Sequence, residues 1–157
     1  MTNELENRVR KANLQYRKNR TAVIQKLEVP IRMTNQGLIA TLSTVDFYGA
    51  FSYSKKKKKI VKPIAFDAKE TLSKTSFPLA NIHQHQLEYL KLWTEIGGVG
   101  FFLIHFKTVH ADEAFVTPID IVDRYWNDTT GRRSIPYSDF KPEWLTKIDD
   151  YLEYFKV

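Results

Sequence analysis

Two carboxylates and one lysine are the side chains of this sequence whose types and spacing best suit catalysis. Asp67 and Lys69 are separated by one residue near the end of an apolar segment, and Asp46 lies upstream. Side chains alternate along a strand, so Asp67 and Lys69 share one face while Phe66 and Ala68 share the other. Two carboxylates can bind Mg²⁺, which positions and acidifies a water beside a phosphodiester. The pattern is typical of metal-dependent nucleases.

This hypothesis requires Asp46 to approach Asp67. A run of five lysines separates their segments and is expected at the tip of a β-hairpin; it consists of Lys55, Lys56, Lys57, Lys58 and Lys59. Pairing through that hairpin would bring the two acids together, and Lys69 would add a fixed positive charge near the attacking water or the phosphate. The alternative is that Asp67 and Lys69 form a solvated strand face.

Several other polar side chains could contribute to the same site. Glu6 is either a third metal ligand or an acid favoured at a helix start by the helix dipole. Gln86 shares a helical stripe with His83 and Leu90, and faces either the cleft or the buried edge of the helix. On one helix, His83 and His85 would lie about 200° apart, so they are not expected to chelate one ion. A phosphate contact or a surface role is expected for these histidines.

Charge favours a polyanionic partner. The chain of 157 residues has a net charge of +6 and a pI of about 9.4. No acidic residue occurs between Phe47 and Phe66, so the field of the lysine run is uncompensated and would attract a DNA backbone. Arg132 and Arg133 could add backbone contacts. The alternative for both groups is an ordinary solvated surface.

Composition excludes several other classes of protein. The absence of cysteine rules out disulfides, zinc–thiolate sites and thiol catalysis, and favours a reducing cytoplasm. The N-terminal residues lack the apolar core of a signal peptide. No apolar run approaches the roughly 20 residues that span a bilayer, so no membrane association is expected. A cytoplasmic protein is therefore predicted.

Hydrophobic periodicity predicts a single domain over residues 1–157. Helices are expected at residues 3–20, 81–96, 118–126 and 143–155. Strands are expected at 22–27, 60–69, 99–106 and 114–117, with one or two more over 37–54, and a polar loop is expected at 71–78. The almost continuously apolar segment 99–106 is expected to be covered on both faces. This order indicates an α/β fold with a central mixed β-sheet flanked by helices.

Longer motifs make the chain resemble the RecU family of Holliday junction resolvases, which belongs to the PD-(D/E)XK nuclease superfamily. The matching segments are FDAKET at 66–71, KTSFPL at 74–79, NIHQHQ at 81–86, DFYG at 46–49 and GRRSI at 131–135. Leu5-Glu6 and Asn13-x-x-Tyr16 match more loosely. The resemblance covers most of the chain and implies a restriction-endonuclease-like fold.

The resemblance implies a homodimer that cuts four-way DNA junctions in recombination and repair, using Mg²⁺ or Mn²⁺. It implies five catalytic positions, which are Asp46, Asp67, Lys69, Glu6 and Gln86, with Asp46, Asp67 and Glu6 at the metal. Thr75 and Ser76 fall in the loop beside the site. Together with His83, the five lysines, Arg132 and Arg133, they are the expected DNA contacts.

Departures from the family pattern affect substrate selectivity more than chemistry. Asp67 stands where family members usually have glutamate. The stalk region around residues 28–44 looks shortened, the lysine-rich hairpin around 53–60 looks longer, and a basic N-terminal extension is missing. These features would suit a phage or prophage member. The alternatives are a non-cleaving module that binds branched DNA or a recombinase, and a less selective nuclease of the same fold.

Overall fold

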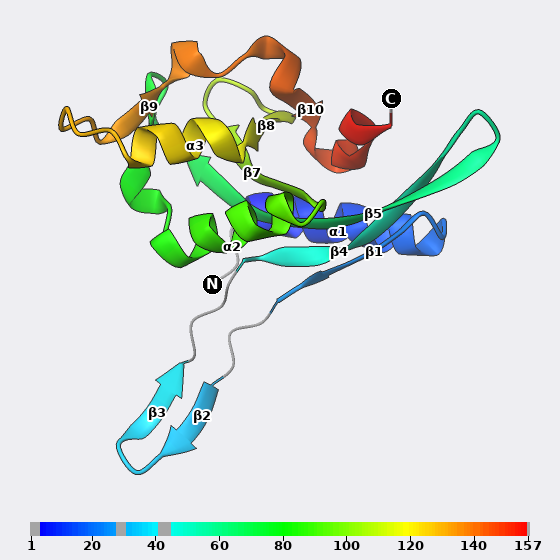
Figure 1. Ribbon diagram of the computed structural model, residues 1–157, viewed down its shortest axis with the longest axis horizontal. Helices are drawn as coiled ribbons and strands as arrows, with labels where there is room; N and C mark the ends of the chain where they lie inside the picture. Colours follow the sequence, from blue (N-terminus) through cyan, green and yellow to red (C-terminus); the bar gives the residue numbers. More distant parts are fainter. Residues whose placement is uncertain (1–3, 28–30, 41–44, 157) are drawn as a thin grey trace.

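The computed structural model describes residues 4–27, 31–40 and 45–156, and its centre is a six-stranded mixed sheet (Figure 1). The strands in spatial order are β1 (Ala22–Lys26), β4 (Phe47–Lys55), β5 (Lys58–Thr71), β7 (Val99–Phe106), β8 (Glu113–Pro118) and β10 (Leu145–Lys147). Neighbouring strands are antiparallel except β5 and β7, which run parallel. The sheet confirms the predicted mixed α/β class.

Helices cover both faces of this sheet, and each face has its own core. On one face α1 (Glu4–Lys18) and the 3₁₀ segment η4 (Ile148–Phe155) bury Leu5, Phe66 and Tyr151. On the other, α2 (Gln84–Glu95) and α3 (Ile119–Trp126) pack over Phe102 and Ile104. β7 lies between the two cores and is buried along most of its length, which confirms that it is covered on both faces.

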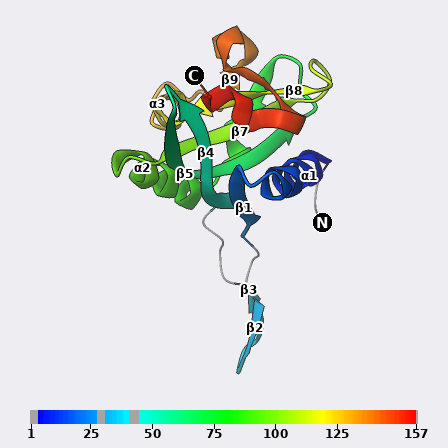
Figure 2. The same cartoon turned by 90° about the vertical axis from the view of Figure 1, so that its right-hand side faces the viewer.

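A two-stranded hairpin extends from the body of the molecule (Figures 1 and 2). It consists of β2 (Ile31–Thr34) and β3 (Gly37–Ala40). This hairpin lies inside the segment predicted as a shortened stalk, whose residues 28–30 and 41–44 fall outside the described part of the chain. Of the one or two strands expected across residues 37–54, the structure has two, β3 and β4, and they belong to different sheets.

β4 and β5 form a long hairpin that carries the lysine run at its turn. Lys55 pairs with Lys58, and the two turn residues Lys56 and Lys57 have φ angles of 50° and 64°. Two positive φ values fit a type I′ turn, whose twist matches that of the flanking strands. All five lysines of the run are exposed. The register places Phe47 opposite Phe66, so Asp46 and Asp67 follow as neighbours at the far end of the hairpin.

Gly49 allows the edge strand β1 to lie against β4. A Cβ atom at this position would fall 1.9 Å from the carbonyl oxygen of Val23, so a larger residue would push the strands apart. β1 ends at Lys26, which is paired with Phe47. The close approach therefore places the end of β1 beside the start of β4.

Two predicted helices were partly wrong. The helix expected from residue 81 begins at Gln84, because residues 79–81 form the 3₁₀ turn η1 (Leu79–Asn81) and His83 is the extended N-cap. The helix expected over 143–155 is instead η3 (Pro142–Trp144), the strand β10 and η4. Backbone pairing of β10 with β8 replaces the helical hydrogen bonds there.

The remaining elements are a short two-stranded sheet and a 3₁₀ turn. β6 (Ser76–Pro78) pairs with β9 (Ser134–Pro136), and η2 (Tyr137–Asp139) follows β9. Residues 71–78, expected to be a polar loop, therefore contain the strand β6, whose pairing with β9 connects them to the loop after α3. None of the described helices has both the length and the apolar character that a membrane crossing requires.

Candidate active site

Asp46 and Asp67 lie against each other where β4 begins. The backbone N–H of Asp46 donates a hydrogen bond to Oδ1 of Asp67 at 2.8 Å, and the N–H of Ala68 donates to Oδ2 of Asp46 at 3.2 Å. Asp67 is fully buried, whereas the Asp46 side chain is 17% exposed. Each aspartate is thus held by the strand that carries the other, so their carboxylates are fixed side by side.

Two further side chains hold the Asp67 carboxylate. Lys69 lies on the same strand face, with Nζ 2.9 Å from Oδ2 of Asp67. Gln86, in the first turn of α2, donates from Nε2 to Oδ1 of Asp67 at 3.3 Å, and its Oε1 accepts a hydrogen bond from the N–H of His83 at 3.2 Å. Gln86 therefore joins the N-terminus of α2 to Asp67 and faces the acid pair.

Lys26 supplies a second ammonium group to the pair. Its Nζ lies 3.2 Å from Oδ1 of Asp46, and its side chain is 15% exposed. Lys26 was not among the residues predicted for the site. A signal was present, because Ala22, Ile24 and Lys26 share the inward face of β1 and a lysine at a core-facing position requires a partner.

Glu6 reaches the same region from α1. A cavity of about 380 Å³ lies there, and its lining consists of Glu6, Asp46, Ala68, Lys69, Glu70, Ala80, Asn81 and His83. Burial, followed by repulsion from Asp46, raises the pKa of Glu6 above its ordinary value. The first helix therefore presents a carboxylate to the cavity that adjoins the acid pair, rather than to open solvent.

The electrostatic state of Asp67 follows from this crowding. Burial raises its pKa to about 7, the negative charge of Asp46 adds to the rise, and the ammonium of Lys69 opposes it. A buried carboxylate beside a second carboxylate is stabilised by added positive charge. The pair is therefore short of positive charge even with Lys26 and Lys69 in place.

The donor set fits a hard divalent cation. Within the described residues, no group of three or more His, Cys, Asp or Glu side chains is arranged around one point. Mg²⁺ needs fewer protein ligands, because it retains several waters and takes phosphate oxygens from a substrate. Asp46 and Asp67 offer only oxygen donors, and a dication would relieve their repulsion. These two residues would hold the ion, and the cavity beside them has room for a phosphate.

The rings of His83 and His85 lie in an arrangement that differs from the one expected from the sequence. Their rings are stacked, with centroids 5.7 Å apart and an angle of 12° between the planes. The expectation that they lie about 200° apart around one helix was wrong, because His83 precedes the first helical residue. His83 alone lines the cavity, so it is the histidine placed to meet a phosphate.

The other predicted DNA contacts lie elsewhere on the surface. Thr75 directly precedes β6 and Ser76 begins it. The N–H groups of both residues donate to Oγ of Ser73, and neither residue lines the cavity. Arg132 and Arg133 are both exposed. The guanidinium of Arg132 lies over the ring of Tyr125 at 5.5 Å, and the backbone carbonyl of Arg133 accepts a hydrogen bond from the N–H of Leu79. The lysine run, Lys55–Lys59, is at the opposite end of the hairpin from the acid pair.

Known proteins resemble this chain over most of its length. The family of recombination protein U, RecU, matches residues 2–157. Holliday junction resolvase RecU of Leuconostoc citreum is 34% identical over 95% of this chain and 77% of its own length. The corresponding protein of Oenococcus oeni is 34% identical over 85% of this chain and 70% of its own length. The corresponding protein of Oceanobacillus iheyensis is 33% identical over 94% of this chain and 81% of its own length.

Proposed function

Because the chain belongs to the recombination protein U family, we propose that it is a divalent-metal-dependent endonuclease that cuts Holliday junctions in DNA. The observation that carries this proposal is the contact between Asp46 and Asp67 beside Lys69, next to a cavity large enough for a phosphate. The family relationship supplies the substrate, and the geometry of the acid pair supports the chemistry.

The proposed reaction is hydrolysis of a phosphodiester. Asp46 and Asp67 would hold Mg²⁺ or Mn²⁺, and the bound ion would acidify a water and neutralise charge on the phosphate. Lys69, fixed against Asp67, would stabilise the negative charge that develops on the phosphate oxygens. Glu6 would accept hydrogen bonds from water in the cavity. Gln86 would keep the Asp67 carboxylate in its orientation.

The oligomeric state and the partners that we propose are those expected of the family. A homodimer would place two such sites on one junction and cut it symmetrically, and a recombinase would be a further partner. The contacts proposed for the DNA backbone are His83 at the cavity, Thr75 and Ser76 at β6, Arg132 and Arg133 before β9, and the lysine run. The β2–β3 hairpin is proposed to be a shortened stalk that engages the junction.

A cleavage assay tests this function. The protein is incubated with a synthetic four-way junction, a linear duplex and a flap substrate, in Mg²⁺, in Mn²⁺ and in EDTA. We expect cutting of the junction with either ion, little cutting of the duplex, and none in EDTA. Equal cutting of all three substrates would instead assign a less selective nuclease.

The matched variants are Asp67→Ala and Asp123→Ala, the second of which removes an acid of α3 that pairs with Lys91. We expect Asp67→Ala to bind the junction and to cut at least about a hundredfold more slowly, and Asp123→Ala to cut normally. Full activity of Asp67→Ala would remove the assignment of the site. Tight binding with no cutting by the unaltered protein would indicate a binding module.

A further inference from the structure

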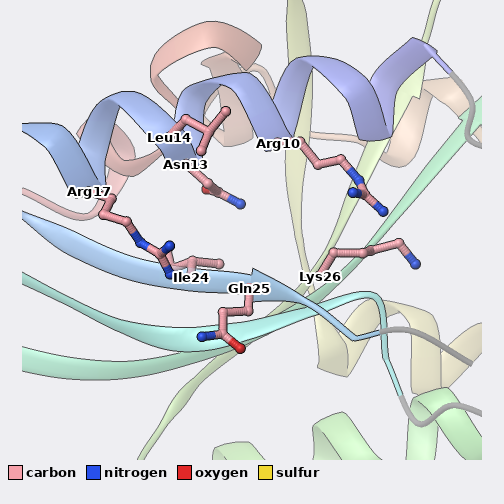
Figure 3. A pocket seen from close by; sticks show the side chains of 7 residues that line it. All are labelled: Arg10, Asn13, Leu14, Arg17, Ile24, Gln25 and Lys26. Carbon is pink, nitrogen blue, oxygen red and sulfur yellow. The ribbon is translucent and has the colours of Figure 1, made fainter. Parts of the chain in front are cut away.

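A groove between α1 and the edge strand β1 opens next to the acid pair (Figure 3). Its volume is about 440 Å³, and its lining consists of Arg10, Asn13, Leu14, Arg17, Ile24, Gln25 and Lys26. Figure 3 shows Arg10 and Arg17 extending from the helix toward the strand, with Asn13 between them. Lys26 closes one end, where its ammonium contacts Asp46.

The lining has the chemistry of an anion site. Three of its seven residues are cations, and the lining contains no carboxylate. Asn13 is buried, and its Oδ1 accepts a hydrogen bond from the hydroxyl of Tyr151, which fixes the side-chain amide in the floor of the groove. Leu14 is 66% exposed and offers an apolar contact of the kind that a sugar ring accepts.

The groove continues away from the acid pair as a line of positive charge. Arg17 also lines a second cavity, of about 350 Å³, together with Arg20 and Lys59. Arg20 and Lys59 in turn line a third, of about 450 Å³, with Lys55 and Lys156. Neither of these cavities has a carboxylate in its lining. Within the described residues, Arg17 and Arg20 form no ion pair with an acid.

We propose that this groove binds the sugar–phosphate backbone of one DNA strand and leads it from the acid pair along α1 toward the lysine-rich turn. The proposal rests on the nuclease function proposed above and specifies the face on which the DNA arm lies. The 15 residues of α1 extend about 22 Å, which is long enough to follow several phosphates of one strand. Contacts of this type position the DNA without reading its sequence.

Salt dependence of binding tests the proposal. Arg17→Gln removes a charge inside the groove, and Lys18→Gln removes one from the neighbouring residue of α1, which lines none of the three cavities. Binding of a fluorescent four-way junction is measured in EDTA across a series of salt concentrations. Loss of one phosphate contact reduces the slope of log K against log salt by about 0.9, which is about an eightfold loss of affinity at ~0.1 M salt.

We expect this change for Arg17→Gln and not for Lys18→Gln, with equal melting temperatures for both. Equal slopes for the two variants would overturn the proposal. This binding comparison is independent of cutting. A chain that never cuts a junction contradicts the nuclease function, whereas a chain that cuts but shows no difference between the variants contradicts only the groove.

Cross-linking gives a second test, because the chain has no cysteine and Leu14→Cys introduces a single thiol. Leu14 is eight residues along α1 from Glu6, or about 12 Å, which is a distance of a few nucleotides along one strand. A junction with a tether on one phosphate at a time, activated as a mixed disulfide, should react with the Cys thiol by exchange, with release of the leaving thiol, within about four nucleotides of the cut. Lys18→Cys is the control. Cross-links that are no more frequent for Leu14→Cys than for Lys18→Cys would place the strand elsewhere.

Discussion

At the scale of the residue, the surroundings of Asp67 favour its protonated form when no cation neutralises it. Its pKa is raised to about 7, first by burial and then by Asp46. For an acid whose pKa is higher in the folded chain, the folded state binds more protons between the unfolded and folded values. The free energy of unfolding therefore falls as pH rises across that interval, by about 4 kcal/mol at most.

This gives a prediction for the metal-free protein. Melting temperatures of the unaltered chain and of Asp67→Asn are measured in EDTA from about pH 4 to pH 8. We expect the unaltered chain to lose stability relative to Asp67→Asn as pH rises, and Mg²⁺ to restore it selectively. A difference in melting temperature between the two proteins that does not change with pH would show that burial and Asp46 do not raise the pKa of Asp67.

Gln86 is a positioning residue, because it holds Asp67 and the N-terminus of α2 at the same time. Loss of such a partner typically weakens metal affinity or activity by about 10- to 100-fold. We expect Gln86→Ala to raise the Mg²⁺ concentration for half-maximal cutting by such a factor. Gln84→Ala is the control, since Gln84 lies in the same turn and bonds only to Glu88 among the described residues. An unchanged Mg²⁺ requirement in Gln86→Ala would contradict this role.

At the scale of the element, the β4–β5 turn combines an unfavourable backbone conformation with positive charge. Lys56 and Lys57 both have positive φ angles, for which Asn-Gly is strongly preferred. Natural lysines at these positions indicate that their charge has a use. We expect the double variant Lys56→Asn/Lys57→Gly to melt at a higher temperature and to bind the junction more weakly, with a shallower salt dependence.

The comparison is made by thermal unfolding and by the same binding titration. A variant that melts higher and binds with unchanged affinity would show that the turn lysines are simply solvated. A variant that melts lower would show that the turn is not of the type that its φ angles indicate.

The elements also show what could be predicted from the sequence. Alternation along β5 and the lysine run were sufficient to predict that Asp67 and Lys69 share a face and that a hairpin connects Asp46 to them. The start of α2 could not be found by periodicity, because Leu79–Asn81 forms a separate turn of 3₁₀ helix. The C-terminal segment has helical periodicity, but pairing of Leu145–Lys147 with β8 overrides it. That pairing is a long-range contact, which a local pattern does not contain.

At the scale of the whole molecule, the sheet brings together residues from distant parts of the chain. β5 carries Asp67 and Lys69, the start of β4 adds Asp46, the end of β1 adds Lys26, and α1 adds Glu6. Helices pack on both faces of the sheet and Asp67 is buried, whereas the groove between α1 and the edge strand β1 is accessible from solvent. A groove lined by cations therefore lies beside a small group of acids. The cations of the groove would attract DNA, and the acids would bind a metal ion beside its backbone.

The most direct test of this account is the position of a bound metal ion. A crystal of the protein soaked in Mn²⁺ gives an anomalous difference map in which the ion is seen without reference to activity. We expect one strong peak bonded to an oxygen of Asp46 and an oxygen of Asp67, and no such peak in Asp67→Asn. A peak elsewhere on the chain, or none beside these carboxylates at saturating Mn²⁺, would contradict the proposed site.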